Sequence, residues 1–261
     1  MHVRQLFDLT GRTALVTGGG RGIGRHIALG LAEAGADVYV ASRKLASCEK
    51  VAKEVEALGR RGHAAEMDLR RIESIDAVTD RIFAETGRLD VLVNNAGFAW
   101  GQPLLEHSLE GWDRVFDVNV RGLFLLSQIV ARHMKEKGGG SIVNVSSVSG
   151  YRGAPDEDEP AVAYNASKGA VIALTKDMAV KLALWGIRVN GIAPGPFLTD
   201  MMNHIRNDEE RLRELEARIP LGRSGAEDDI KGAAVFLASD AAAYVTGHTL
   251  IVDGGWLVRA G

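Results

Sequence analysis

Short apolar runs alternate with longer amphipathic stretches along the whole chain. The runs predict seven strands, over Thr13–Thr17, Asp37–Ala41, His63–Met67, Leu89–Val93, Ser141–Ser146, Ile187–Ile192 and Thr249–Val252. The longer stretches predict helices over Arg25–Ala34, Leu45–Leu58, Ile72–Glu85, Trp112–Lys137, Ala161–Leu184, Asp208–Ala217 and Asp228–Ala238. Apolar strands separated by helices are typical of a parallel sheet covered on both faces. We therefore predict a single α/β domain over residues 1–261, with a doubly wound, seven-stranded parallel sheet.

Composition and charge exclude several classes of partner. The 261 residues carry a formal net charge of −3, which gives no general electrostatic basis for binding nucleic acid or an anionic membrane. No apolar run approaches the roughly 20 residues that span a bilayer, and residues 1–8 lack the regions of a signal peptide. Cys48 is the only cysteine, and no Cys/His cluster indicates a metal site. We expect a cytoplasmic protein that acts on a small molecule.

A glycine-rich segment follows the first predicted strand and leads directly into a helix. It reads Thr17-Gly18-Gly19-Gly20-Arg21-Gly22-Ile23-Gly24, with the spacing GxxxGxG in place of the common GxGxxG. Glycines let the backbone turn tightly and approach a pyrophosphate, and the N-terminus of the following helix supplies free N–H groups. A purely structural turn is the alternative. The position after the first strand of an alternating pattern favours a dinucleotide site.

The end of the second predicted strand indicates which dinucleotide binds. It reads Val40-Ala41-Ser42-Arg43, so the acidic residue that would bind the ribose 2′-hydroxyl of NAD is missing. Arg21 and Arg43 are placed to meet a 2′-phosphate, which suits them because a guanidinium donates hydrogen bonds in pairs. We predict NADP(H) as the preferred cofactor. NAD(H) is the alternative if both arginines are solvated surface residues.

Tyr164 and Lys168 are the leading candidates for acid–base chemistry. They lie four residues apart in a predicted helix and so share a face. A free phenol, with a pKa of about 10, is a poor base at neutral pH. A neighbouring ammonium favours the phenolate, so we expect Lys168 to lower the pKa of Tyr164. With Ser147 to hydrogen-bond the substrate oxygen, these residues predict proton transfer to or from a carbonyl/alcohol pair at the C-terminal edge of the sheet.

Several motifs, in order from Leu9 to Trp256, resemble those of the classical short-chain dehydrogenase/reductases. The matching segments are Thr17–Gly24 (TGxxxGxG), Asn94-Asn95-Ala96-Gly97 (NNAG), Asn119, Ser147, Tyr164 and Lys168 (the family's tetrad), Pro194-Gly195 with Thr199 (PGxxxT) and Asp253-Gly254-Gly255 (a C-terminal turn). The resemblance implies a Rossmann fold. It also implies an oxidoreductase that transfers a hydride between a nicotinamide and a carbonyl or alcohol.

The resemblance assigns a role to each matching residue. Tyr164 would be the acid–base, Lys168 would bind the nicotinamide ribose and tune Tyr164, and Ser147 would orient the substrate oxygen. Asn119 would hold a water that links Lys168 to solvent, and Asp68 would contact the adenine. The cofactor-binding residues expected in all are Gly18, Arg21, Gly22, Ile23, Gly24, Ser42, Arg43, Asp68, Leu69, Asn95, Ala96, Gly97, Tyr164, Lys168, Pro194, Gly195 and Thr199.

One stretch departs from the family pattern. Ser147 and Tyr164 are 17 positions apart, which is several more than the family usually shows. The additional residues fall in Arg152–Pro160, which contains the acidic run Asp156–Glu159 and lies at the mouth of the predicted site. The run is either a solvated surface loop or a rim that shapes access and disfavours anionic ligands. If neutralising Asp156–Glu159 left kcat/KM unchanged for both neutral and anionic ketones, the rim would be ruled out.

Bulky apolar residues are expected to line the substrate pocket, and residues 197–220 to form a lid over it. The expected wall residues are Trp100, Tyr151, Phe197, Met201 and Met202, each with packing in the core as its alternative. The resemblance also implies a homotetramer, or a dimer, assembled through the two long helices and the C-terminal strand.

The substrate class remains open between two enzymatic hypotheses. The basic cofactor loop slightly favours a 3-oxoacyl-type or general ketone reductase. The opening segment Leu6–Arg12 resembles gluconate 5-dehydrogenases and favours the alternative, a sugar-acid or polyol dehydrogenase. A catalytically silent nucleotide sensor is the alternative from a different class. The presence of Ser147, Tyr164 and Lys168 disfavours it.

Overall fold

A computed structural model of the chain, which describes residues 1–199 and 202–259, contains one parallel sheet of seven strands. The strands are β1 (Thr13–Thr17), β2 (Asp37–Ser42), β3 (Gly62–Glu66), β4 (Val91–Asn94), β5 (Gly140–Val145), β6 (Ile187–Pro194) and β7 (Thr249–Val252). Their order across the sheet is β3-β2-β1-β4-β5-β6-β7. The predicted α/β fold is confirmed, and the predicted strand ends lie within two residues of those observed.

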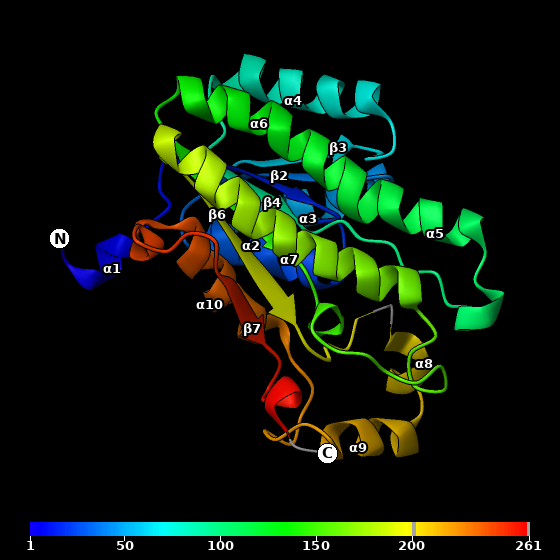
Figure 1. The fold of residues 1–261 in the computed structure, drawn as a ribbon. Helices are drawn as coiled ribbons and strands as arrows, with labels where there is room; N and C mark the ends of the chain where they lie inside the picture. Colours follow the sequence, from blue (N-terminus) through cyan, green and yellow to red (C-terminus); the bar gives the residue numbers. More distant parts are fainter. Residues whose placement is uncertain (200–201, 260–261) are drawn as a thin grey trace.

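Helices cover both faces of this sheet (Figure 1). They are α1 (Val3–Leu6), α2 (Gly22–Glu33), α3 (Leu45–Ala57), α4 (Ile72–Thr86), α5 (Leu109–Phe116), α6 (Leu123–Glu136), α7 (Val162–Leu182), α8 (Asn203–Arg206), α9 (Glu209–Ala217) and α10 (Glu227–Ala238). One core joins α2, α3 and α10 to the sheet, and a second joins α4, α6 and α7. Neighbouring residues Leu15 and Val16 of β1 enter different cores, which explains why this strand is apolar on both faces. None of the described helices is long and apolar enough to cross a membrane.

The helix predicted over Trp112–Lys137 is interrupted, which corrects that prediction. α5 ends at Phe116 and α6 begins at Leu123, and a π-helical turn, Asp117–Gly122, lies between them. Asn119 is buried in this turn, where its Oδ1 accepts from Phe98 N (2.8 Å) and its Nδ2 donates to Phe98 O (2.9 Å). Such turns are frequent at functional sites, and the hydrophobic period that predicts a helix does not reveal them.

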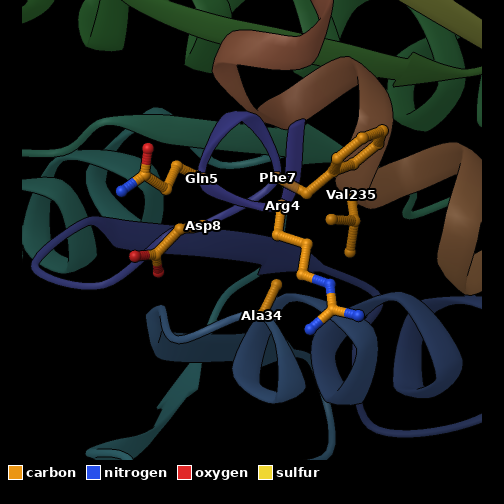
Figure 2. Close-up of a pocket in the computed structure, with 6 residues that line it drawn as sticks. All are labelled: Arg4, Gln5, Phe7, Asp8, Ala34 and Val235. Carbon is orange, nitrogen blue, oxygen red and sulfur yellow. The ribbon is translucent and has the colours of Figure 1, made fainter. Parts of the chain in front are cut away.

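The strand order places the candidate site at one edge of the sheet. The order reverses between β1 and β4, and open α/β sheets bind ligands at the carboxyl ends of the strands beside such a reversal. A cavity of about 470 Å³ lies elsewhere, lined by Arg4, Gln5, Phe7, Asp8, Ala34 and Val235 (Figure 2). Ala34 ends α2, the helix that starts at the carboxyl end of β1 and runs back along the sheet. This cavity therefore lies toward the amino ends of the strands and is not the candidate site.

α8 and α9 lie beyond the carboxyl ends of the strands, near the segment that leads into α7 (Figure 1). Arg218, which follows α9, lies 3.7 Å from Asp158 of that segment. Phe197 anchors the start of this region, because it is buried and forms a parallel bridge to Gly225. The described parts of this region, 197–199 and 202–220, are thus placed near the candidate site, and the action of residues 197–220 as a lid stays a prediction.

Candidate active site

The glycine segment after β1 forms a bare backbone turn at the N-terminus of α2. Gly18 and Gly22 have φ angles of 63° and 52°, in the left-handed region that favours glycine. A Cβ on Gly24 would lie 2.3 Å from both the carbonyl oxygen of Gly18 and the Nδ2 of Asn95. The segment therefore excludes side chains where the N–H groups of α2 are exposed. This is the arrangement that receives a pyrophosphate.

Asn95 fastens the glycine segment to the loop after β4. Its Nδ2 donates to Thr17 O (2.9 Å) and to Gly18 O (3.2 Å). The Thr17 hydroxyl in turn accepts from the backbone N–H groups of Asn95 and Ala96, each at 3.1 Å. These bonds connect two of the predicted cofactor motifs, and they explain why an asparagine is needed at position 95.

The segment after β6 closes the other side of the glycine turn. A Cβ on Gly22 would lie 3.3 Å from the methyl group of Thr199, so Thr199 stands directly opposite the turn. Gly195 follows Pro194 at the end of β6, where a Cβ would lie 2.5 Å from the side chain of Asp253. The structure thus brings the predicted Pro194, Gly195 and Thr199 to the same edge as the glycine segment.

The outer rim carries the residues predicted to recognise the adenosine half of the cofactor. Arg43 is exposed to solvent. Ser42 is half-buried, and its Oγ lies 3.0 Å from the buried Cys48 Sγ. Arg70 holds Asp68, with Nε 3.0 Å from Oδ1 and Nη2 2.6 Å from Oδ2. These bonds, together with the charge of Arg43, lower the pKa of Asp68. Sequence reasoning missed Arg70, although the spacing Asp-x-Arg was visible.

Three further predicted cofactor residues are placed by the backbone around this rim. Arg21 immediately precedes α2 in extended conformation. Ile23, in the first turn of α2, packs against the core, and Leu69 is buried beside Gly122. Contacts of Ile23 and Leu69 with a dinucleotide would therefore come chiefly from their backbone atoms.

Ser147, Tyr164 and Lys168 meet at the carboxyl end of β5. The Ser147 hydroxyl hydrogen-bonds the phenol of Tyr164. Lys168 Nζ donates to Val145 O (2.8 Å) and lies 5.5 Å from the centre of the Tyr164 ring. The structure therefore brings together the three residues that the sequence predicts as the acid–base group.

Asn119 and Gly97 border the same group. Asn119 Nδ2 donates to Ser167 Oγ (2.9 Å), which joins the π turn to α7 next to Lys168. A Cβ on Gly97 would lie 3.6 Å from Lys168 Nζ and 3.7 Å from Asn119 Oδ1. Gly97 thus lies directly beside the buried Lys168 and Asn119.

Burial dominates the pKa of both titrating residues. It raises the pKa of the Tyr164 phenol to about 12, although the hydrogen bond from Ser147 lowers that pKa; the charge of Glu159 raises it further. Burial also lowers the pKa of Lys168 to about 8. The expectation that Lys168 lowers the pKa of Tyr164 is therefore wrong for this structure. The ammonium hydrogen-bonds the Val145 carbonyl instead of the phenol.

The acidic run is largely exposed, but three of its four carboxylates are bonded within the protein. Asp156 accepts from Leu104 N (3.1 Å), Asp158 pairs with Arg218 (3.7 Å) and Glu159 pairs with Arg152 (3.3 Å). A cavity of about 260 Å³ opens beside it, lined by Leu104, Arg152, Gly153, Ala154, Asp156, Glu159, Val162, Asn165 and Ala166. Paired carboxylates repel an incoming anion less than free ones, which weakens the rim hypothesis.

The expected pocket wall is only partly present. Phe197 is buried in the core, so it is a packing residue, not a pocket residue. Trp100 packs closely against Gly111, and the Arg114 guanidinium lies 5.5 Å from its ring. Tyr151 is exposed and Met202 half-buried. Met201 lies outside the described residues.

Comparisons with known proteins agree with this geometry. Residues 18–257 match a family model described as Enoyl-(Acyl carrier protein) reductase. The chain is 42% identical over 254 residues to the 2-dehydro-3-deoxy-D-gluconate 5-dehydrogenase of Escherichia coli, covering 97% of this chain and 98% of that protein. It is also 42% identical over 254 residues to the gluconate 5-dehydrogenase of Gluconobacter oxydans, covering 96% of each.

A solved structure shows the same similarity. The crystal structure of a gluconate 5-dehydrogenase from Burkholderia cenocepacia, in complex with NADP and tartrate, superposes with a TM-score of 0.93 at 39% sequence identity. The match covers 99% of this chain and 100% of that chain. The similarity therefore extends over the fold and every segment that builds the candidate site.

Proposed function

The chain belongs to the short-chain dehydrogenase/reductase family and is an oxidoreductase, and on that premise we propose that it interconverts a secondary hydroxyl and a keto group of a sugar acid with NADP(H). The observation that carries the proposal is the near full-length similarity to proteins named as 5-dehydrogenases of gluconate and 2-dehydro-3-deoxy-D-gluconate. The sequence slightly favoured a 3-oxoacyl-type substrate, whereas these relatives support its alternative. They are enzymes, so they give no support to a silent sensor.

The residues around the glycine segment fit NADP(H). A pyrophosphate needs a side-chain-free backbone at a helix N-terminus, which Gly18, Gly22 and Gly24 provide. β2 ends at Ser42 without a carboxylate for a ribose 2′-hydroxyl, and the exposed Arg43 follows. The Burkholderia relative was crystallised with NADP. When bound, NADPH supplies the hydride.

The acid–base chemistry belongs to Ser147 and Tyr164. Ser147 Oγ accepts from Ser149 N (3.1 Å), which leaves its own O–H to donate toward the phenol or toward a substrate oxygen. With a pKa of about 12, Tyr164 holds its proton at neutral pH and is ready to give it to the oxygen of a carbonyl that is being reduced. In the oxidising direction, the phenol must first lose that proton.

Lys168 and Asn119 support the exchange of this proton. A lysine with a pKa of about 8 changes its protonation near neutral pH, so it can take up and release protons during turnover. Asn119 lies in the same cluster through Ser167 and Gly97. Its role in holding a water that links Lys168 to solvent is part of the proposal.

Assembly as a homotetramer, or a dimer, is also part of the proposal. Large apolar side chains are exposed on the long helices, with Phe124 of α6 41% exposed and Val180 of α7 79% exposed. Leu109 of α5 is 80% exposed. Exposed apolar side chains that gather on neighbouring helices are typical of subunit interfaces. Light scattering measures the mass of the particle in solution, and the mass of a monomer would contradict the proposed assembly.

The cytoplasmic location stays a prediction.

The experiment that tests the function is a turnover assay of the purified chain with NADPH and with NADH. The panel contains keto-sugar acids, the corresponding neutral keto-sugars, 3-oxoacyl thioesters and simple diketones. We expect NADPH oxidation with the keto-sugar acids at the highest kcat/KM. Preference for 3-oxoacyl thioesters would return the assignment to the hypothesis that the sequence favoured, and preference for NADH would contradict the role of Arg43.

A further inference from the structure

Glu159 is a largely buried carboxylate at the end of the inserted segment Arg152–Pro160. Its side chain is only 20% exposed. Its Oε1 accepts from Ser149 Oγ at 2.5 Å, and its Oε2 accepts from Arg152 Nη2 at 3.3 Å. The amide of Asn165, oriented with its nitrogen toward the acceptors, donates to Oε1 at 3.1 Å. Three side chains thus fix this carboxylate, and two of them come from outside the insertion.

Ser149 links Glu159 to the acid–base group. The backbone N–H of Ser149 donates to Ser147 Oγ (3.1 Å), while the Ser149 hydroxyl donates to Glu159. Ser147 in turn hydrogen-bonds the phenol of Tyr164. Glu159 acts through Ser149, because it fixes the turn that orients Ser147 toward the phenol.

The charge of Glu159 also acts on Tyr164 directly. Its carboxylate raises the pKa of the phenol, because a nearby negative charge opposes formation of a second one. Apart from Glu157, which is exposed, the charged groups on the segments that meet around the start of α7 are bonded elsewhere or paired. Among the described residues these are Lys168 with Val145 O, Arg152 with Glu159, Glu110 with Arg114, Asp117 with Arg121, and Asp253 with the N–H groups of Gly255 and Leu257. Residues 95–103 and 194–199 carry no charged side chain.

We propose that Glu159 is a positioning residue of the active site, which fixes Ser147 through Ser149 and places a negative charge beside the acid–base group. The inference rests on the proposed function, because it takes Tyr164 as the acid–base. In reduction, the neutral phenol gives its proton to the carbonyl oxygen and recovers one from solvent. In oxidation, the phenolate must take the proton of the alcohol. The charge of Glu159 therefore favours reduction of the carbonyl, and it moves the rise of kcat/KM for oxidation of the alcohol to higher pH.

The test compares Glu159→Gln, which keeps a hydrogen-bonding side chain but removes the charge, with Glu159→Ala, which removes both. The matched control is Glu157→Gln, since Glu157 is an exposed carboxylate two positions away in the same run. The first measurement is the pH profile of kcat/KM for oxidation of the alcohol by the full chain. We expect Glu159→Gln to move the rise of this profile to lower pH by roughly one unit. Glu157→Gln should leave it in place.

Glu159→Ala separates positioning from charge. It should lower kcat in both directions by roughly tenfold, because Ser147 loses the support of Ser149, while NADPH binding stays unchanged. Arg152→Gln provides a second charge variant should Glu159→Gln fold poorly. It leaves the Glu159 carboxylate without its ion-pair partner and should move the oxidation profile to higher pH, opposite to Glu159→Gln.

A second measurement does not depend on turnover. The chain has four tyrosines, so carbon-13 labelling of the tyrosine ring gives few resonances, and Tyr164→Phe assigns the one from Tyr164. The onset of phenolate formation should come at lower pH in Glu159→Gln than in the wild type. Coincident titrations and coincident pH profiles for wild type, Glu159→Gln and Glu157→Gln would overturn the inference. A shifted titration in a chain that turns over no carbonyl would instead overturn the proposed function and leave the effect of the charge standing.

Discussion

Replacing Gly24 with alanine tests how the glycine segment is held. A Cβ at this position in the first turn of α2 would lie 2.3 Å from Gly18 O and 2.3 Å from Asn95 Nδ2. Neither atom can move away freely, because one belongs to the backbone and the other donates to Thr17 O and Gly18 O. The substitution must therefore displace the turn from the loop after β4.

Three contributions set the size of the effect. Alanine is favoured over glycine inside a helix by about 0.5–1 kcal/mol. Overpacking costs about 1–3 kcal/mol, and loss of the two hydrogen bonds of Asn95 costs about 1 kcal/mol each. The net change is a loss of about 3 kcal/mol in the free energy of unfolding, which lowers Tm by roughly 6–12 °C for a domain of this size.

Gly232→Ala is the matched control for this substitution. Gly232 lies inside α10, and a Cβ there meets no atom within 4 Å. The same chemical change should therefore stabilise the chain by about 0.5–1 kcal/mol. Urea unfolding measures both variants, and fluorescence titration measures the Kd for NADPH, which should rise only in Gly24→Ala. Equal stability and equal NADPH binding in the two variants would refute the reasoning.

Three further predictions concern the cofactor rim, the π turn and the ion pair at the start of α10. Arg43→Ala should reduce the ratio of kcat/KM for NADPH over NADH by at least roughly tenfold, because a charge-assisted hydrogen bond contributes about 1.5–3 kcal/mol; an unchanged ratio would remove Arg43 from the cofactor site. Asn119→Ala should lower the free energy of unfolding by about 2–3 kcal/mol in urea, since it leaves two partly buried backbone groups of Phe98 without their partner. Arg223 lowers the pKa of Asp229 from 3.8 to about 2, so the pair stabilises the fold above pH 4 and loses that contribution as pH falls toward 2. Tm should therefore fall less over this window in Asp229→Ala than in the wild type.

The alternation of apolar runs was sufficient to predict the sheet, because the inner strands β1, β2, β4, β5 and β6 are buried on both faces and read as largely apolar runs. Leu15 and Val16 show this directly, since adjacent residues enter opposite cores. The same pattern could not predict the π turn around Asn119, which is bonded to Phe98, about twenty residues earlier in the chain. It also missed α1, a four-residue helix capped by His2, which is too short to show a period.

The motifs predicted which residues form the candidate site, but they did not predict the pKa values of those residues. Motif order placed Ser147, Tyr164 and Lys168 together, as the structure has them. The spacing of four between Tyr164 and Lys168 suggested a lowered phenol pKa, but spacing carries no information about burial, which raises it. The unusual length before Tyr164 marked the acidic run without revealing that Glu159 turns inward to Ser149. Those contacts depend on tertiary packing.

The most direct test of the account compares the wild type with Tyr164→Phe, in NADPH binding and in turnover of a keto-sugar acid. The account predicts that the phenylalanine variant binds NADPH with a nearly unchanged Kd, because the ring remains and the glycine segment is untouched. Its kcat should fall by roughly 10²–10⁴-fold, because the proton donor is gone. Turnover by Tyr164→Phe at the wild-type rate would contradict the central claim that Tyr164 is the acid–base of an NADP(H)-dependent oxidoreductase.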